Sequence, residues 1–281
     1  MQFFDETLDI SHFEKGETIK KGKTNKVYKV VNKHTNIIFV AKAPIKEFNE
    51  FTKEEIVNYC QDINIISKLN HPSIINFIGY SPIDFKNRQK PVIVTEYALN
   101  DTLSNLLQSN DESLKEWNDT KKLINIYGFA SGMSYIHTHN IIHCDLTSKS
   151  VLIDNNFYPK IFKFDSSKEI TNDSFTETSE YSDSLEKSKS NDVYSFSIII
   201  YDILTNKQPV EEPIPQCYYQ LIEKCRSSNP EERPTFDQII KDLETNTEFI
   251  TESVNEEEYK NYIRMIKEAQ ITFDYTHPIL D

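Results

Sequence analysis

Three short motifs carry the charged side chains that could act on a phosphate group. Lys42 ends a β-branched run, Asp145 lies within Ile142–Leu146, and Lys163 lies within Pro159–Asp165. An ammonium group pairs with phosphate as a point charge, and carboxylate oxygens are ligands that magnesium prefers. The three motifs are far apart in the chain, so folded elements have to bring these groups together.

The first third of the chain predicts strands and one helix. Residues 27–31 and 37–42 are rich in β-branched side chains, and 74–78 and 92–97 repeat this pattern. Between them, apolar residues recur close to the helical period over 52–69. We therefore expect a β-rich region that carries a single helix.

The remainder of the chain predicts helices. One apolar stripe runs along 119–139, and shorter helical patterns follow at 191–205, 216–226 and 235–245. After the acidic run Glu256–Glu258, apolar side chains again fall on one helical face. A β-rich part followed by a helical part predicts an α+β fold of two lobes.

This order also predicts the domain limits. We expect a small lobe over 15–97, a large lobe over 98–247 and an acidic tail with one helix over 248–281. Whether the tail helix folds onto the large lobe or binds a partner stays open.

The composition is that of a globular protein rather than a nucleic-acid binder. Hydrophobic residues make up 38% of the 281 residues, and the net charge of −13 leaves no basic surplus for nucleic-acid phosphates. None of the four cysteines has Cys-x-x-Cys spacing, which favours reduced thiols and a cytoplasmic location. The chain starts without a signal-peptide pattern, and the apolar run at 197–202 is too short for a bilayer, so we expect no membrane contact.

Five short motifs occur in order along the chain: Leu69–Ile75, Thr95–Tyr97, Ile142–Leu146, Ser190–Ser197 and Asn229–Phe236. Together they resemble the motifs of the protein kinase superfamily over about residues 15–245. They are similar to the exit from the regulatory helix, the hinge, the catalytic loop, the start of the central helix and the closing motif. Each is weak alone, but five at family spacing form a specific pattern. The closing motif, with Leu221–Cys225 before it, resembles the tyrosine-kinase-like group.

The resemblance implies a nucleotide pocket with altered positions. Of three glycines expected in the phosphate loop, only Gly22 is present. Lys42 matches the lysine that holds the α- and β-phosphates, but its usual Glu partner is Asp62, and Val40 replaces a smaller residue beside the adenine. ATP binding therefore stays open. The implied nucleotide-binding residues are Gly22, Val27, Val40, Lys42, Thr95, Glu96, Tyr97 and Leu152.

The catalytic positions implied by the resemblance depart further from the family. Asp145 matches the catalytic base, but Cys144 replaces the Arg before it and Thr147 replaces a phosphate-neutralising Lys. Ser150 and Lys163 stand in the two positions that would hold magnesium. A neutral hydroxyl is a poor magnesium ligand and an ammonium is none. We therefore expect no bound metal and a base that is not used.

Two alternatives concern the surroundings of Lys163. Asp165 could act as a metal ligand, either through a two-residue shift of register or by reaching in from its own position. Lys163 could itself hold ATP without magnesium, or it could close the pocket by pairing with Asp62 or Asp145.

The positions that build the family's fold are kept. The resemblance implies an apolar stack that couples the lobes, anchored by Asp192, and a buried ion pair between Glu180 and Arg233. The Ser/Thr-rich segment 163–180 is either a solvated loop or a phosphorylation switch. The structural residues are Ile66, Phe77, His143, Phe164, Glu180, Asp192 and Arg233.

These departures predict a pseudokinase, that is, a protein-binding scaffold or regulator in signalling with impaired magnesium-ATP chemistry. The alternative is a weakly active or unconventional Ser/Thr protein kinase that transfers the ATP γ-phosphate to protein through Lys42, Asp145 and Asp165. Losing charge-stabilising groups costs on the order of 10³–10⁵ in phosphoryl-transfer rate, which favours the first reading. The sequence names no partner and no oligomeric state.

Overall fold

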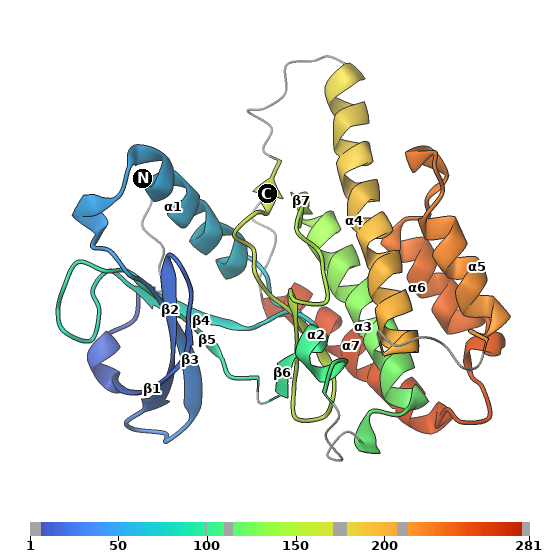
Figure 1. Cartoon of the computed structure of the whole chain (residues 1–281), viewed down its shortest axis with the longest axis horizontal. Coiled ribbons are helices and arrows are strands. Elements are labelled where there is room, and N and C mark those ends of the chain that lie inside the picture. Colours follow the sequence, from blue (N-terminus) through green and yellow to red (C-terminus); the bar gives the residue numbers. More distant parts are fainter. Residues whose placement is uncertain (1–6, 99, 110–114, 171–178, 207–212, 277–281) are drawn as a thin grey trace. The chain divides into compact units, whose positions relative to one another are not determined.

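The chain forms two compact units, which are described separately. One comprises Met1–Asn70 and Ile75–Tyr97, and the other comprises His71–Ile74 and Ala98–Asp281. The computed structural model describes residues 7–98, 100–109, 115–170, 179–206 and 213–276, with the backbone alone for 179–188 and 272–276 (Figure 1). The short segment 71–74 thus belongs to the second unit, although the chain on both sides of it belongs to the first.

A five-stranded antiparallel sheet forms the first unit. Its order is β1-β2-β3-β5-β4. Alternate side chains of a strand point to opposite faces, and one face of this sheet buries Val30, Ala41 and Val94. The strands are β1 (Phe13–Lys21), β2 (Asn25–Asn32), β3 (Ile38–Pro44), β4 (Phe77–Ser81) and β5 (Val92–Glu96).

One helix, α1 (Lys53–Ser67), completes the first unit. It begins in a capping box, in which Glu55 N–H donates to Thr52 Oγ1 at 3.2 Å and Thr52 N–H donates to Glu55 Oε2 at 2.8 Å. Tyr59 and Ile63 on α1 pack with Ile93 of β5. The helix expected over 52–69 is therefore confirmed.

The strand predicted over 74–78 is wrong at its start. β4 begins at Phe77, and Ile74 instead forms a parallel bridge with Ile161 in the second unit. The β-branched pair Ile74-Ile75 has strand propensity, but the pattern of side chains does not say which strand it will pair with.

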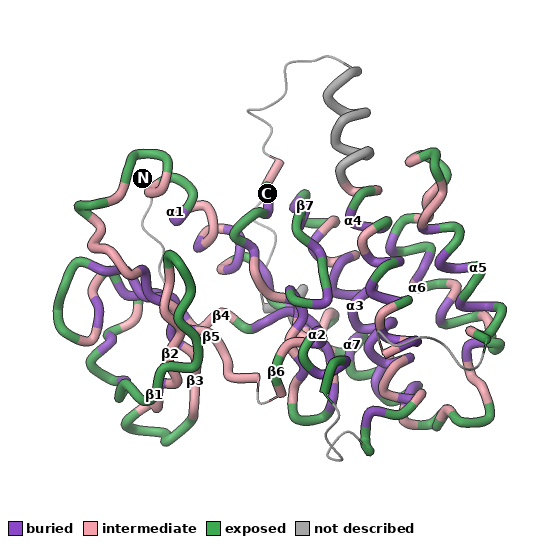
Figure 2. The backbone as a smooth tube through the Cα atoms, viewed as in Figure 1, coloured by how far each residue is buried: buried purple, intermediate pink, exposed green. Residues whose placement is uncertain are grey.

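Helices make up most of the second unit, and α3 lies at its centre. Thirteen of the twenty residues of α3 are buried, so it appears mostly purple in Figure 2. Phe196 of α4 stacks on Phe129 of α3 with ring centroids 5.2 Å apart. The helices are α2 (Leu103–Leu106), α3 (Asp119–Thr138), α4 (Ser179–Thr205), α5 (Gln216–Cys225), α6 (Phe236–Thr245) and α7 (Glu256–Thr276).

Two small sheets carry the loops of interest in the second unit. β6 (Asn100–Thr102), β8 (Val151–Ile153) and β9 (Pro159–Ile161) form one, and β7 (Ile141–Ile142) and β10 (Lys168–Glu169) form the other. The α+β fold expected from the sequence is thereby confirmed. Within the described residues, no helix combines the length and apolar character needed to cross a bilayer.

The tail helix α7 packs onto α3, which answers the question left open by the sequence. Tyr259, Tyr262 and Ile266 are buried on this face. A Cβ atom at Gly128 of α3 would lie 2.1 Å from the Tyr262 hydroxyl, so only glycine leaves room for this ring. The helix runs from Glu256 to Thr276.

The segment 71–74 is held in the second unit by its own side chains. Ser73 N–H donates to His71 Nδ1 at 3.0 Å, which leaves His71 Nε2–H to donate to Ser131 Oγ at 3.2 Å. Burial, with a smaller effect from the Lys160 charge, lowers the pKa of His71 from 6.5 to about 3. The imidazole therefore stays neutral in the folded protein at any moderately acid pH.

We expect His71 to make the protein less stable as the pH falls. Between about pH 6.5 and 3 the unfolded chain binds a proton at His71 that the folded chain does not. The free energy of unfolding then falls by up to about 1.4 kcal/mol per pH unit from this residue. Urea unfolding at pH 7, 6 and 5 measures the slope.

The control for this slope is His71→Asn, because an Asn oxygen can accept the Ser73 N–H in an Asx turn. We expect a smaller pH slope in this variant, and some slope remains because burial also lowers the pKa of His143. An unchanged slope would show that His71 is protonated in the folded state.

Candidate functional site

The residues implied by the family resemblance fall into two sets, one in each unit. In the first unit, Val27 lies directly across the ladder from Lys42, and Val40 lies across from Thr95. Residues directly opposite in a ladder share a face, and Val40 and Lys42 are two positions apart on β3. The four side chains therefore lie on one face of the sheet, and all four are half-buried.

The same face carries the helix with the predicted lysine partner. Ile93, which lies across from Lys42, packs against Tyr59 and Ile63 of α1. Asp62 precedes Ile63 on this helix and is half-buried. The fold thus places α1 over the face of Lys42, and the Lys42–Asp62 ion pair stays a prediction.

The predicted phosphate loop is the tight turn between β1 and β2. Gly22 N–H donates to Asn25 O at 2.8 Å, which closes the turn. Lys20 lies across from Val27. A long side chain therefore stands where the family has a glycine, in a position that lets less of the backbone approach a phosphate.

The predicted hinge begins at the end of β5. Glu96 N–H donates to Asn76 O at 2.9 Å, and Glu96 Oε1 accepts Asn76 N–H at 2.8 Å. Phe77 lies across from Thr95, and Tyr97 follows with its side chain half-buried. The Glu96 carboxylate thus fixes the start of β4 against the end of β5.

In the second unit, Asp192 organises the predicted catalytic loop. Its Oδ2 accepts His143 N–H at 2.9 Å and pairs with His137 Nε2 at 3.0 Å, while its Oδ1 accepts Cys144 N–H at 3.1 Å. Cys144 has a φ of 65°, a backbone conformation that residues other than glycine adopt only at an energetic cost. The Asp192 contacts hold the loop in that conformation and leave Asp145 exposed.

His143 links this loop to the segment of Lys163. Its ring lies 5.6 Å from the ring of Phe164, and its Nε2 lies 3.3 Å from Phe162 O. Ser167 Oγ donates to His143 O at 3.2 Å. Burial lowers the pKa of His143, so a neutral imidazole donates from Nε2 to the Phe162 carbonyl.

Ser150 is committed to its own loop. Its hydroxyl accepts Thr147 N–H at 2.9 Å and donates to Thr147 O at 2.8 Å, and the residue is fully buried. Its carbonyl accepts Phe162 N–H at 2.9 Å. The hydroxyl proton and one lone pair are both used inside the protein, so Ser150 closes a turn and does not face outward.

Lys163 has a φ of 66° and is half-buried, with Nζ 5.6 Å from the centre of the Phe162 ring. Asp165, two positions on, is exposed. The two predicted magnesium positions hold the Lys163 ammonium and the Ser150 hydroxyl, which is hydrogen-bonded to Thr147. Neither group fits magnesium, which prefers accessible oxygen ligands.

The remaining predicted residues are placed as follows. Thr147 is exposed and Leu152 is half-buried on β8. Arg233 donates from Nη1 to Ser190 O at 3.1 Å and from Nε to Ser227 O at 3.1 Å. The side chain of Glu180 lies outside the described residues, so the Glu180–Arg233 ion pair stays a prediction.

The sequence reasoning missed the role of His137. His137 falls within the apolar stripe of 119–139, yet its Nε2 pairs with Asp192. A histidine in the last turn of a buried helix was the available signal, since buried imidazoles are almost always hydrogen-bonded.

A hollow of about 510 Å³ also lies on the second unit. It is lined by Tyr158 and by residues 255–265 at the start of α7, and by none of the predicted catalytic residues. It is therefore no support for a nucleotide site.

Comparison with known proteins agrees with the resemblance. A family model described as protein kinase domain matches residues 13–216. A probable serine/threonine-protein kinase of Dictyostelium discoideum is 29% identical over 217 residues, which are 68% of this chain and 21% of the relative. From the same organism, the dual specificity protein kinase splA is 27% identical over 84% of this chain and 12% of its own length.

A third relative, the probable serine/threonine-protein kinase drkA of Dictyostelium discoideum, is 29% identical over 85% of this chain and 40% of its own length. The chain thus spans less than half the length of each of these relatives. Because the family model covers well over half of the chain, its five-stranded sheet and helical unit are those of a known family, and the chain belongs to the protein kinase domain family.

Proposed function

We propose that this protein is a pseudokinase that acts as a protein-binding scaffold or regulator in signalling. The observation that carries the proposal is the pair of groups at the two predicted magnesium positions. One is the Lys163 ammonium, and the other is a Ser150 hydroxyl already hydrogen-bonded twice to Thr147. Phosphoryl transfer depends on metal ions that neutralise the phosphates.

The contrast between Ser150 and Asp192 supports this proposal. Asp192 keeps three donors and holds the catalytic loop in its strained conformation. Ser150 uses its hydroxyl to close the same loop from the other side. Both residues thus shape the loop, although Ser150 stands at a position that would carry its chemistry.

The setting of the protein is also part of the proposal. The closing motif with Leu221–Cys225 supports a place in the tyrosine-kinase-like group. All four cysteines are free thiols, which supports a cytoplasmic location. A protein partner is the ligand that we propose, and ATP is a second ligand whose binding can be tested directly.

The second candidate is a weakly active or unconventional Ser/Thr protein kinase. Two observations favour it: Lys42 lies half-buried on the same sheet face as Val27, and Asp145 is exposed on an ordered loop. The printed names of the relatives describe kinases of serine/threonine or dual specificity. In this reading Asp165, rather than Lys163, would hold a metal.

We expect magnesium to add nothing to any stabilisation by ATP. A ligand that binds only the native state at about 100 times its Kd stabilises by about 2.7 kcal/mol. Thermal unfolding with ATP, with magnesium and with both measures this effect. We expect the shift with both to equal the shift with ATP alone.

Two variants make this result decisive. Lys42→Ala should remove any ATP shift that uses the predicted pocket. A magnesium-dependent shift, together with phosphate transfer that Asp145→Ala abolishes, would replace the pseudokinase proposal with the kinase alternative.

We expect Lys163→Asp to gain a magnesium-dependent ATP shift that the natural protein lacks. The change puts a carboxylate in the predicted metal position, and Asp tolerates a positive φ better than Lys does. The matched control is Lys163→Asn, which has the same shape and the same backbone tolerance but no charge.

A gain in the Asp variant alone would support the assignment of Lys163 to the metal position. Equal behaviour of the Asp and Asn variants would contradict that assignment, and the two-residue shift to Asp165 would then be the better register.

A further inference from the structure

Three separate elements hold the segment 71–74 in the second unit. From α3, Ser131 Oγ contacts His71 Nε2 at 3.2 Å. From β9, Ile161 N–H donates to Ser73 O at 2.8 Å. From the tail helix α7, the Tyr262 hydroxyl contacts Ser73 Oγ at 3.1 Å.

The Tyr262 side chain is buried between aromatic neighbours and α3. Its ring lies 4.6 Å from the ring of Tyr158 and 6.3 Å from that of Tyr127, and Gly128 leaves space for the hydroxyl. Only 2% of the residue is exposed. Burial raises the pKa of Tyr262, so the hydroxyl keeps the proton that it shares with Ser73.

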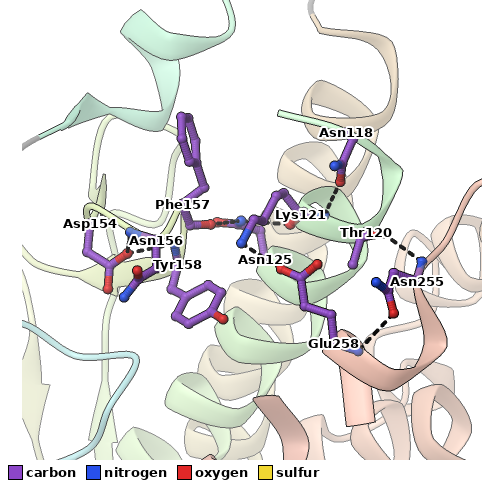
Figure 3. A network of polar contacts seen from close by, with 10 residues as sticks. All are labelled: Asn118, Thr120, Lys121, Asn125, Asp154, Asn156, Phe157, Tyr158, Asn255 and Glu258. Carbon is purple, nitrogen blue, oxygen red and sulfur yellow. Dashed lines mark hydrogen bonds and ion pairs between the residues drawn. The ribbon is translucent and has the colours of Figure 1, made fainter. Parts of the chain in front are cut away.

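The start of α7 is fastened to α3 independently of Tyr262. Asn255 N–H donates to Thr120 Oγ1 at 2.8 Å, and the Lys121 ammonium pairs with Glu258 at 2.7 Å. Figure 3 shows Asn255 and Glu258 beside Thr120 and Lys121 of α3, with Asn125 of the same helix joined to Phe157. Loss of the Tyr262 hydroxyl therefore leaves α7 in place.

The chain that enters 71–74 comes directly from α1. That helix ends at Ser67, and its exit is held by Lys68 N–H to Ile65 O and Leu69 N–H to Ile66 O, both at 3.3 Å. Ile66 is one of the residues predicted to couple the lobes. Only three residues, Lys68 to Asn70, thus separate the segment 71–74 from the end of α1.

We propose that Tyr262 is a positioning residue through which the docked tail helix α7 holds the segment 71–74 against α3 and β9. Docking of α7 adds the Tyr262–Ser73 contact to those from α3 and β9. When α7 is released, this contact is lost and the other two remain. The tail is then a conformational device built into the domain. This inference stands whether the protein is a pseudokinase or a kinase.

Hydrogen exchange of the full chain tests the proposal in Tyr262→Phe, which removes a single hydroxyl. We expect exchange of the Ile74 and Ile161 amides, which bond to His71 O and Ser73 O, to rise about fivefold. That factor corresponds to about 1 kcal/mol, the net value of one hydrogen bond. A smaller increase should follow at Lys68 and Leu69.

The matched control is Tyr259→Phe. Tyr259 is equally buried on α7, but its hydroxyl donates to Leu243 O of α6 at 3.1 Å. A general loosening of α7 would raise exchange at 71–74 in both variants. We expect exchange at 71–74 to rise in Tyr262→Phe alone. An equal rise in the two variants, or no rise in either, would overturn the proposal.

Two further variants separate the contact from its surroundings. Ser73→Ala removes the other partner, so its effect on exchange at Ile74 should not add to that of Tyr262→Phe. Gly128→Ala places a methyl group against the Tyr262 hydroxyl and should release 71–74 at least as much as Tyr262→Phe does. Additive effects of Ser73→Ala and Tyr262→Phe would show that the two hydroxyls do not act on each other.

Discussion

The buried carboxylate of Asp192 is the interaction on which the rest of the second unit's site depends. Only 2% of this residue is exposed, and a buried charge of this kind is tolerable only when its oxygens are fully hydrogen-bonded. Its three donors come from His137 on α3 and from the backbone at His143 and Cys144. One side chain on α4 thereby joins a helix to the loop that carries Asp145.

The effect of Asp192 continues through His143. Because the loop backbone is fixed, the imidazole is held against Phe164 and the Phe162 carbonyl. Two residues beside these contacts have a positive φ, Cys144 next to His143 and Lys163 between Phe162 and Phe164. Residues other than glycine adopt such a φ only at an energetic cost. Such conformations persist where the surrounding contacts determine them, as they do here. The loop of Asp145 and the segment of Lys163 are thus fixed relative to each other through His143.

Much of this arrangement could be predicted from the sequence, for physical reasons. Runs of β-branched residues predicted β2, β3, β5 and part of β4. Apolar periodicity predicted α1 and the helices α3 to α7, since burial of one face imposes a period on the residues. The partner of Ile74 could not be predicted, because strand propensity does not select a partner. The same limit applies to Ser150: its residue type shows what it cannot hold, but only coordinates show that Thr147 takes its hydroxyl.

The tail shows how a residue far from any motif comes to matter. Gly128 and Gly132 are four residues apart on α3, so they lie on the same face of the helix. The missing side chain at Gly128 admits Tyr262, and a Cβ at Gly132 would crowd Ile161 at 2.8 Å and Ser73 at 3.3 Å. Each glycine costs helix stability of about 1 kcal/mol relative to Ala. That cost is offset because α3 can then receive both the tail helix and the segment 71–74 on one face, so the tail belongs to the structural core of this unit.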